Sequence, residues 1–264
     1  MNTCSKDYLW LNISSLPYFR GLLRAVEAQV YEDLELPSPS LDLGCGDGHF
    51  SRIAFNEVVS VGLDPWAGPV RIAAREGKYK QVIQGTGDRI PFSKEYFSSA
   101  VSNSVLEHIP DLDPVFQELS RVLKPGAPFI FCVPNENFLL NLSVSNWLDK
   151  VGLHKFADKY RAFFNIISRQ HHCDPRNVWE ERLEKHGFFI EDMWDYFSPR
   201  SLAILEWGHY LGLPSLVCHF LFKKWILVPK RWNLWLTLKI VQPGYTEQRR
   251  QEKGSYAFYL ARKK

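Results

Sequence analysis

The chain has 264 residues, of which 45% are apolar, and this is enough to bury one full core with substantial insertions. Its net charge of +3 is unremarkable, and its five cysteines show no paired spacing. This spacing excludes a disulfide framework and a zinc pattern and predicts the reduced thiols of an intracellular protein. The first residues lack a basic start followed by an apolar run, so we expect no signal peptide.

The first two-thirds of the chain show an alternation of helical and strand patterns. Apolar residues recur with a helical rhythm over 16–34, and Pro37 and Pro39 then end the helix. Such alternation specifies a parallel sheet with helices on both faces. The pattern that follows predicts strands at 40–44, 58–64, 81–85, 99–104 and 127–133, and helices at 50–56, 67–76 and 114–123.

After Pro134 the pattern changes, and two insertions interrupt the core. Residues 135–173 are too long for a simple connection, and their aromatic residues predict helices that form a lid over the crevice. A helix at 174–186 and strands at 188–196 and 256–260 return to the core. We therefore divide the chain into an N-terminal helical segment (1–38), a core (39–134), a lid (135–173), a return of the core (174–199), a hydrophobic and basic insertion (200–253) and a last core strand (254–264).

The first strand runs into three alternating glycines, Gly44, Gly46 and Gly48, and then into a helix. Each glycine removes a Cβ where the backbone turns sharply or lies flat on a ligand, and the helix points its free N–H groups at that spot. Sixteen residues after Gly48 the second strand ends at Asp64, whose carboxylate can accept hydrogen bonds from the two hydroxyls of a ribose. His49 stands where a dinucleotide fingerprint requires its last glycine, which argues against an NAD-dependent enzyme.

The run 40–50, with Asp42 before the glycines, resembles the first motif of class I S-adenosylmethionine (SAM) methyltransferases. The runs 84–92, 102–111 and 121–130 are similar to later motifs of that family, in the order the family requires. The best match is the small-molecule branch that includes quinone-biosynthesis enzymes (methyltransferase type 11), and it covers about residues 39–134. The resemblance implies an α/β fold, a Rossmann-like, doubly wound, mostly parallel seven-stranded sheet, with SAM as the cofactor.

The resemblance also implies which residues meet the cofactor. Thr86 departs from the family, which has an acid there, so either Asp88 contacts the adenine amino group or a weaker hydroxyl or backbone contact does. Cys45 is interpreted as a packed small residue rather than a nucleophile, since no base lies nearby in the sequence. The expected cofactor contacts are Asp42, Gly44, Cys45, Gly46, Gly48, Asp64, Gly87, Asp88 and Asn103.

Transfer of a methyl group from a sulfonium requires mainly that the acceptor be aligned and water excluded. A hydroxyl or phenol acceptor would also use a base, for which His108, His171 and His172 are the candidates, because they follow strand ends or precede a core helix. The alternatives are that His108 only bonds local backbone at a helix start and that His171 and His172 form a solvated loop pair. We expect no metal at this site.

The second insertion combines tryptophans with cations. Residues 207–222 carry no formal charge, but their length and Pro214 argue against a membrane-spanning helix. From Lys223 to Lys264 the chain has eleven lysine or arginine residues and two acids. Tryptophan interleaved with cations over 207–241 suits peripheral contact with a membrane interface, whereas the alternative is a hydrophobic cap packed on the catalytic core.

Together these patterns predict a cytoplasmic SAM-dependent methyltransferase, associated with a membrane surface if the second insertion binds lipid, that acts on a small, lipophilic acceptor. An RNA or protein methyltransferase and a non-catalytic module of the same fold stay as alternatives, although nucleic acid is not the expected partner. The sequence determines neither the identity of the acceptor nor the oligomeric state.

Overall fold

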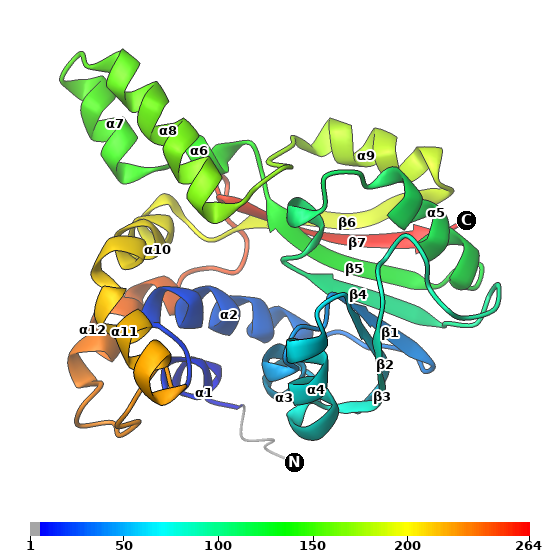
Figure 1. The fold of residues 1–264 in the computed structure, drawn as a ribbon. Helices are drawn as coiled ribbons and strands as arrows, with labels where there is room; N and C mark the ends of the chain where they lie inside the picture. The colour runs from blue at the N-terminus through cyan, green and yellow to red at the C-terminus, as the bar shows by residue number, and fades with distance from the viewer. Residues whose placement is uncertain (1–5) are drawn as a thin grey trace.

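The computed structural model describes residues 6–264, so Cys4 lies outside the described residues. Its centre is a seven-stranded sheet with helices on both faces (Figure 1). The strands lie in the order β3-β2-β1-β4-β5-β7-β6. They are β1 (Ser40–Leu43), β2 (Val59–Asp64), β3 (Tyr79–Gln84), β4 (Ser99–Asn103), β5 (Pro128–Pro134), β6 (Phe188–Tyr196) and β7 (Tyr256–Lys263).

The first five strands pair in parallel, and β7 pairs antiparallel with both β5 and β6. The predicted doubly wound, mostly parallel, seven-stranded sheet is therefore confirmed. The last strand is longer than predicted, because its pairing with β5 and β6 continues to Lys263. Since β6 and β7 are neighbours, the second insertion leaves the sheet after β6 and returns to the same edge.

The helices cover both faces of the sheet and build the two insertions. The helix predicted over 16–34 is shorter in the structure: it begins after Pro17, which occupies the N-cap position, and ends at Tyr31. The helix α1 before it was not predicted. The helices are α1 (Tyr8–Ile13), α2 (Tyr18–Tyr31), α3 (His49–Ala54), α4 (Ala67–Glu76), α5 (Asp113–Val122), α6 (Asn137–Leu140), α7 (Ser143–Lys150), α8 (His154–Ser168), α9 (Arg176–Lys185), α10 (Pro199–Leu211), α11 (Leu213–Phe222) and α12 (Trp235–Tyr245).

The central strand β5 shows how the sheet is buried. Ile130 and Cys132 pack with residues of α1 and α2, whereas Phe129 and Phe131 pack on the other face with residues of α5 and α9. Successive side chains of a strand point to opposite faces, so a strand covered on both sides is apolar throughout. All seven residues of β5 are buried accordingly.

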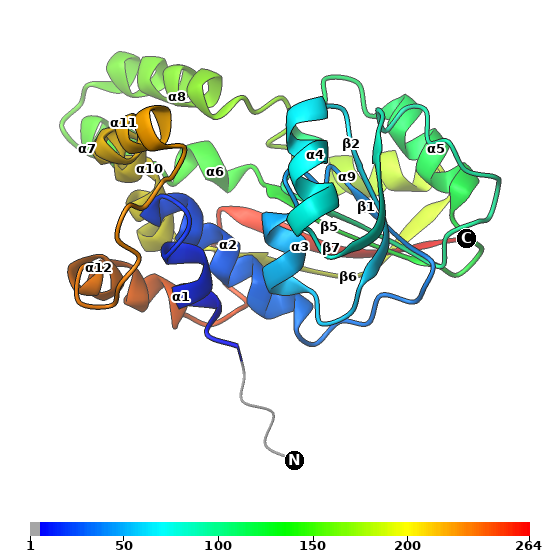
Figure 2. The same cartoon turned by 60° about the horizontal axis from the view of Figure 1, so that its bottom comes forward.

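The two insertions lie at the same end of the molecule, opposite the C-terminus, in both views (Figures 1 and 2). The lid contains α6, α7 and α8, and α7 and α8 pack on each other as they project from the core. In the second insertion, α10 and α12 pack on α2. Across residues 6–264, no helix has the length and apolar character needed to cross a bilayer.

Candidate functional site

The loop after β1 follows a path that requires glycine at two positions. Gly44 has φ +80°, and a Cβ there would lie 2.4 Å from Cγ1 of Val105. Gly48 has φ +76°, and its Cβ would lie 2.7 Å from the Cα of Gly77. At Gly46, by contrast, a Cβ would meet no described atom within 4 Å. The loop is therefore pressed against the protein at both ends and borders open space in its middle.

The carboxylate of Asp64 fastens this loop to the end of β2. Its Oδ2 accepts a hydrogen bond from the backbone N–H of Gly46, and its Oδ1 accepts one from that of Trp66, each at 3.0 Å. Each carboxylate oxygen has a further lone pair, so Asp64 can still accept hydrogen bonds from the hydroxyls of a ligand. The structure thus brings together the glycine loop and the acid that the sequence singled out.

A cavity of about 680 Å³ opens beside the glycine loop and Asp64, and this volume lies in the range of small-molecule sites. The ends of β1 and β2 and the loops after β3 and β4 form its wall. Trp66 is 71% exposed and adds an aromatic surface to the lining. Of the expected cofactor residues, the lining contains Gly44, Asp64, Gly87 and Asp88, together with Thr86.

Asp42 and Cys45 are buried rather than part of this lining. Asp42 is 5% exposed, and its Oδ2 accepts a hydrogen bond from the hydroxyl of Tyr79 at 2.5 Å. Burial raises the pKa of Asp42 to about 7, an effect that the Tyr79 hydrogen bond opposes. Burial also raises the pKa of the Cys45 thiol far above its ordinary value, so the thiol stays protonated, as expected of a packed residue.

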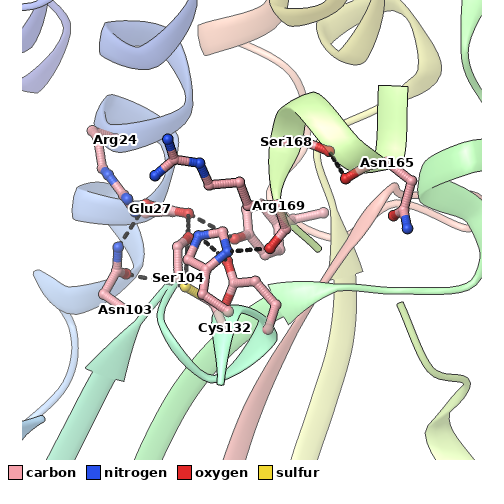
Figure 3. Close-up of polar contacts among 11 residues, drawn as sticks. Arg24, Glu27, Asn103, Ser104, Cys132, Asn165, Ser168 and Arg169 are labelled. Carbon is pink, nitrogen blue, oxygen red and sulfur yellow. Dashed lines mark hydrogen bonds and ion pairs between the residues drawn. The ribbon is translucent and has the colours of Figure 1, made fainter. Parts of the chain in front are cut away.

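Asn103 belongs to a buried polar cluster around Glu27 of α2 (Figure 3). The carboxylate of Glu27 is fully buried and accepts hydrogen bonds from Arg24 Nη1 at 2.6 Å, Asn103 Nδ2 at 2.7 Å, Ser104 Oγ at 2.8 Å and the Tyr196 hydroxyl at 3.0 Å. The cluster joins α2 to the ends of β4 and β6. The amide of Asn103 is therefore engaged by protein, and its cofactor role stays a prediction.

A second cavity, of about 180 Å³, lies between α2, the segment after β4, the end of α8 and α10. Its apolar walls include Phe19, Leu23, Phe138, Ile167 and Leu205. His108 lines this cavity as well as the larger one and so marks the place where they are adjacent. The polar residues in its lining include Arg20, Arg24, Glu107, His108 and His209.

Glu107 is the most unusual group of this second cavity. Its side chain is 2% exposed, and its Oε2 has no hydrogen-bond partner among residues 6–264. Burial raises the pKa of Glu107 to about 8, because water no longer solvates the charged form. The carboxyl group is therefore mainly protonated at pH 7.

His108 has one ring nitrogen fixed and one free. Its Nδ1 lies 2.9 Å from the carbonyl oxygen of Arg169, which only accepts hydrogen bonds, so Nδ1 carries the hydrogen (Figure 3). Its Nε2 then bears the lone pair and lies 3.9 Å from Oε1 of Glu107. Burial lowers the pKa of His108 below its ordinary 6.5, so the ring is neutral at pH 7 and able to accept a proton.

The other two candidate bases lie in the connection between α8 and α9, which contacts the segment after β4. Both ring nitrogens of His172 are engaged, Nδ1 with Asp174 at 3.2 Å and Nε2 with the carbonyl oxygen of Ile109 at 2.9 Å. His171 is exposed, and its backbone N–H donates to the carbonyl oxygen of Glu107. Within the described part of the chain, no three His, Cys, Asp or Glu side chains are grouped to hold a metal ion.

Sequence reasoning did not single out Glu107, Glu27 or Trp66. Glu107 had a signal, since it directly precedes a candidate base within a motif. Arg24 and Glu27 also had one, because residues three apart share a helix face. Trp66 had only its position two residues after Asp64.

Comparison with known proteins identifies related sequences. The family described as "Methyltransferase domain" matches residues 41–131. An uncharacterized methyltransferase of Mycobacterium tuberculosis is 29% identical over 203 residues, which cover 75% of this chain and 68% of the relative. A sterol 4-C-methyltransferase of Caenorhabditis elegans is 31% identical over 151 residues, which cover 49% of this chain and 43% of the relative.

Solved structures share the fold. The geranyl diphosphate C-methyltransferase of Streptomyces coelicolor, solved with Mg²⁺, geranyl diphosphate and S-adenosyl-L-homocysteine, superposes with a TM-score of 0.55 at 16% identity. The superposition covers 93% of this chain and 83% of that one. At this level of identity, the likeness shows the architecture alone.

Proposed function

We propose that this chain, a class I methyltransferase by its sequence family and its fold, transfers the methyl group of SAM to a small, lipophilic acceptor. The observation that carries the proposal is the contact between the glycine loop and Asp64 beside one cavity. SAM supplies a methyl group already activated by its sulfonium charge. The chain's own residues therefore have to bind, orient and exclude water.

The larger cavity fits the adenosyl part of SAM. Asp64 has lone pairs for the ribose hydroxyls, and the exposed ring of Trp66 can stack on the adenine ring. Asp88 and Thr86 lie in the same lining, where they can meet the adenine amino group. In the adjacent second cavity, Arg20 is exposed and forms no ion pair with any residue from 6 to 264. Its guanidinium can therefore bind a carboxylate of the ligand.

The second cavity is the proposed acceptor side. Phe19, Leu23, Phe138, Ile167 and Leu205 give it an apolar part of the wall, while Glu107, His108 and His209 belong to the polar part of the lining and can orient the acceptor. A lipophilic acceptor is supported by the sterol 4-C-methyltransferase among the sequence relatives and by the geranyl diphosphate C-methyltransferase that shares the fold.

We assign the acceptor's proton to His108. The free Nε2 faces Glu107, and the ring is neutral at pH 7, so it can take a proton as the new bond to the methyl carbon forms. Protonated Glu107 is placed to donate a hydrogen bond to the acceptor, because its Oε2 lacks any partner among the described residues. His172 is better suited to hold the loop, since both its ring nitrogens are engaged.

Isothermal titration of S-adenosylhomocysteine tests the cofactor half of the proposal. We expect Asp64→Ala to weaken binding about tenfold to a hundredfold, the range for hydrogen bonds to a charged group. Glu57→Ala, an exposed acid away from both cavities, is the matched control and should bind as the wild type does. Absence of wild-type binding, or equal binding by Asp64→Ala, would refute the site.

Radiolabelled methyl transfer tests the acceptor half. Quinone precursors, sterols and polyprenyl lipids are the acceptors to screen, with polar metabolites, RNA and protein as contrasts. We expect label in the lipid extract and none after Asp64→Ala. Label confined to RNA or protein fractions would contradict the acceptor class while leaving the cofactor site intact.

A further inference from the structure

The helix α11 (Leu213–Phe222) is apolar except for Ser215 and His219, which share one face, and yet it has no buried residue. Leu213, Val217, Phe220 and Leu221 are 60%, 56%, 76% and 62% exposed. A helix that is hydrophobic all round is normally found inside a protein core or in contact with lipid. The hydrophobic-cap interpretation is wrong for this helix, although α10 and α12 do pack on α2.

The segment that follows α11 exposes further apolar side chains. Leu227, Trp232, Trp235, Leu236 and Ile240 are between 47% and 72% exposed. We name the exposed apolar residues of α11 and of 227–240 the second-insertion surface. Monomeric proteins rarely expose so many large apolar side chains within one segment unless they contact a partner or a membrane.

The charges within this segment all have one sign, although Asp7 from another part of the chain pairs with Arg231. Residues 207–246 contain five lysine or arginine residues and no aspartate or glutamate. Lys223 and Lys224 follow α11 directly, and both are exposed. Lys239 Nζ lies 4.8 Å from the ring centre of Trp235, and Lys223 Nζ lies 5.8 Å from that of Phe220. Aromatic rings beside cations at the edge of an apolar surface match the headgroup layer of an anionic bilayer.

We propose that the second-insertion surface docks the protein on an anionic membrane, with α11 and Trp232 in the interface and the lysines against lipid headgroups. Insertion of an apolar helix to headgroup depth buries its exposed side chains without spanning the bilayer. A second copy of the chain is a poorer partner, because a symmetric contact would set the cations of this segment against those of its copy. Single-stranded RNA is a poorer partner as well: Phe220, Trp232 and Trp235 could stack on bases, but the exposed aliphatic side chains around them offer no flat ring.

The position of this surface suits a lipophilic acceptor, a link that rests on the proposed function. α10 contributes Leu205 and His209 to the lining of the second cavity, and only Gly212 separates α10 from α11. Both insertions also lie at the same end of the molecule (Figures 1 and 2). A lipophilic acceptor dissolved in the bilayer would thus lie one helix away from the cavity that receives it.

Sedimentation of the full-length chain with vesicles tests the proposal without any use of methyl transfer. The vesicles contain either phosphatidylcholine alone or phosphatidylcholine with about 30% phosphatidylglycerol, whose headgroups are anionic. We expect binding to the anionic vesicles and a decrease in binding at higher salt. Phe220→Ser with Trp232→Ser should lower the partition coefficient at least about tenfold, because two large side chains no longer leave water. Lys224→Glu should lower the partition coefficient several-fold, because it replaces a cation near the anionic headgroups with an acid.

Matched controls lie at the other end of the molecule. Phe189→Ser removes an exposed aromatic residue of β6, whose partner in the sheet, Arg262, lies close to the C-terminus. Lys94→Glu reverses an exposed lysine whose side chain is 76% exposed. Both variants should bind vesicles as the wild type does, and thermal melts should show that all four variants are folded.

Three results would overturn the proposal. One is the absence of sedimentation with anionic vesicles, and another is equal sedimentation of the surface variants and the wild type. The third is a dimer in light scattering, or an RNA gel shift, that depends on Phe220 and Trp232 while vesicle binding does not. If the wild type binds SAM but not anionic vesicles, this proposal fails while the proposed function stands.

Discussion

Glu107 illustrates how the position of one residue determines its chemistry. Burial raises its pKa to about 8 and outweighs the lowering by a backbone hydrogen bond and by Arg24, and Glu27 acts in the same direction as burial. Arg24 and Glu27 belong to α2, and the other titratable groups near Glu107 include His108, Cys132, Cys173 and Tyr256. A carboxyl group with this pKa is a hydrogen-bond donor at neutral pH and becomes a charged acceptor only in alkaline solution.

The two neighbouring groups predict a bell-shaped dependence of kcat/KM on pH for an acceptor that loses a proton. On the acid side, protonation of His108 removes the base. Because burial lowers the pKa of His108, this limb should lie below the ordinary His value of 6.5. Above about pH 8, ionisation of Glu107 removes the donor, and the rate should fall. The measurement is methyl transfer at saturating SAM from pH 5 to pH 9, a range of about two units on either side of neutrality.

Two variants assign the limbs of this profile. Glu107→Gln stays neutral at every pH, so the alkaline limb should disappear. His108→Asn should lose the acid limb and about a hundredfold in rate, a typical contribution of a general base. If Glu107→Gln keeps the alkaline fall, another group causes it and the role assigned to Glu107 is wrong.

At the scale of elements, Glu27 holds α2 over the ends of β4 and β6. Ser104 follows β4 with φ +51°, a left-handed conformation that is uncommon for a residue other than glycine. Its hydroxyl donates to Glu27 Oε1, and this bond helps to hold the turn. The same turn leads into Glu107 and His108, so the anchoring of α2 and the geometry of the acceptor side depend on one carboxylate.

Glu27→Ala should lower the free energy of unfolding by about 3 kcal/mol, because Arg24 and three further donors lose their buried acceptor. Glu27→Gln keeps an acceptor oxygen but removes the charge, so we expect an intermediate loss. Urea unfolding measures both. Glu35→Ala removes an exposed acid of the loop after α2 and should stay within about 0.5 kcal/mol of the wild type. A loss of less than about 1 kcal/mol for Glu27→Ala would contradict the anchoring role.

Local patterns in the sequence predicted the elements and half of the site. Gly44, Gly48 and Asp64 could be identified because turn geometry requires glycine and because parallel strands end side by side. The Glu27 cluster could not, since it joins residues 76, 77 and 169 positions apart. His172 was a candidate base until the structure placed an acceptor at each of its ring nitrogens, which no spacing in the sequence reveals.

At the scale of the whole molecule, burial is distributed unevenly. Nine of the fourteen residues of α2 are buried, and all residues of β1, β2, β4 and β5 are buried as well. α11 at the insertion end has none. Local opening costs least where few apolar contacts are lost, so α11 should be locally less stable than α2 and the buried strands.

Hydrogen exchange followed by mass spectrometry should reveal this difference. Isolated helices of about ten residues are marginal in water, so the amides of α11 should exchange far faster than those of α2 and β5. Anionic vesicles should slow the exchange of α11 and leave β5 unchanged, because lipid supplies the apolar contacts that the protein does not. Slow exchange in α11 without vesicles, comparable with that in α2, would mean that the helix is stabilised by the protein itself and that its exposed apolar surface needs no partner.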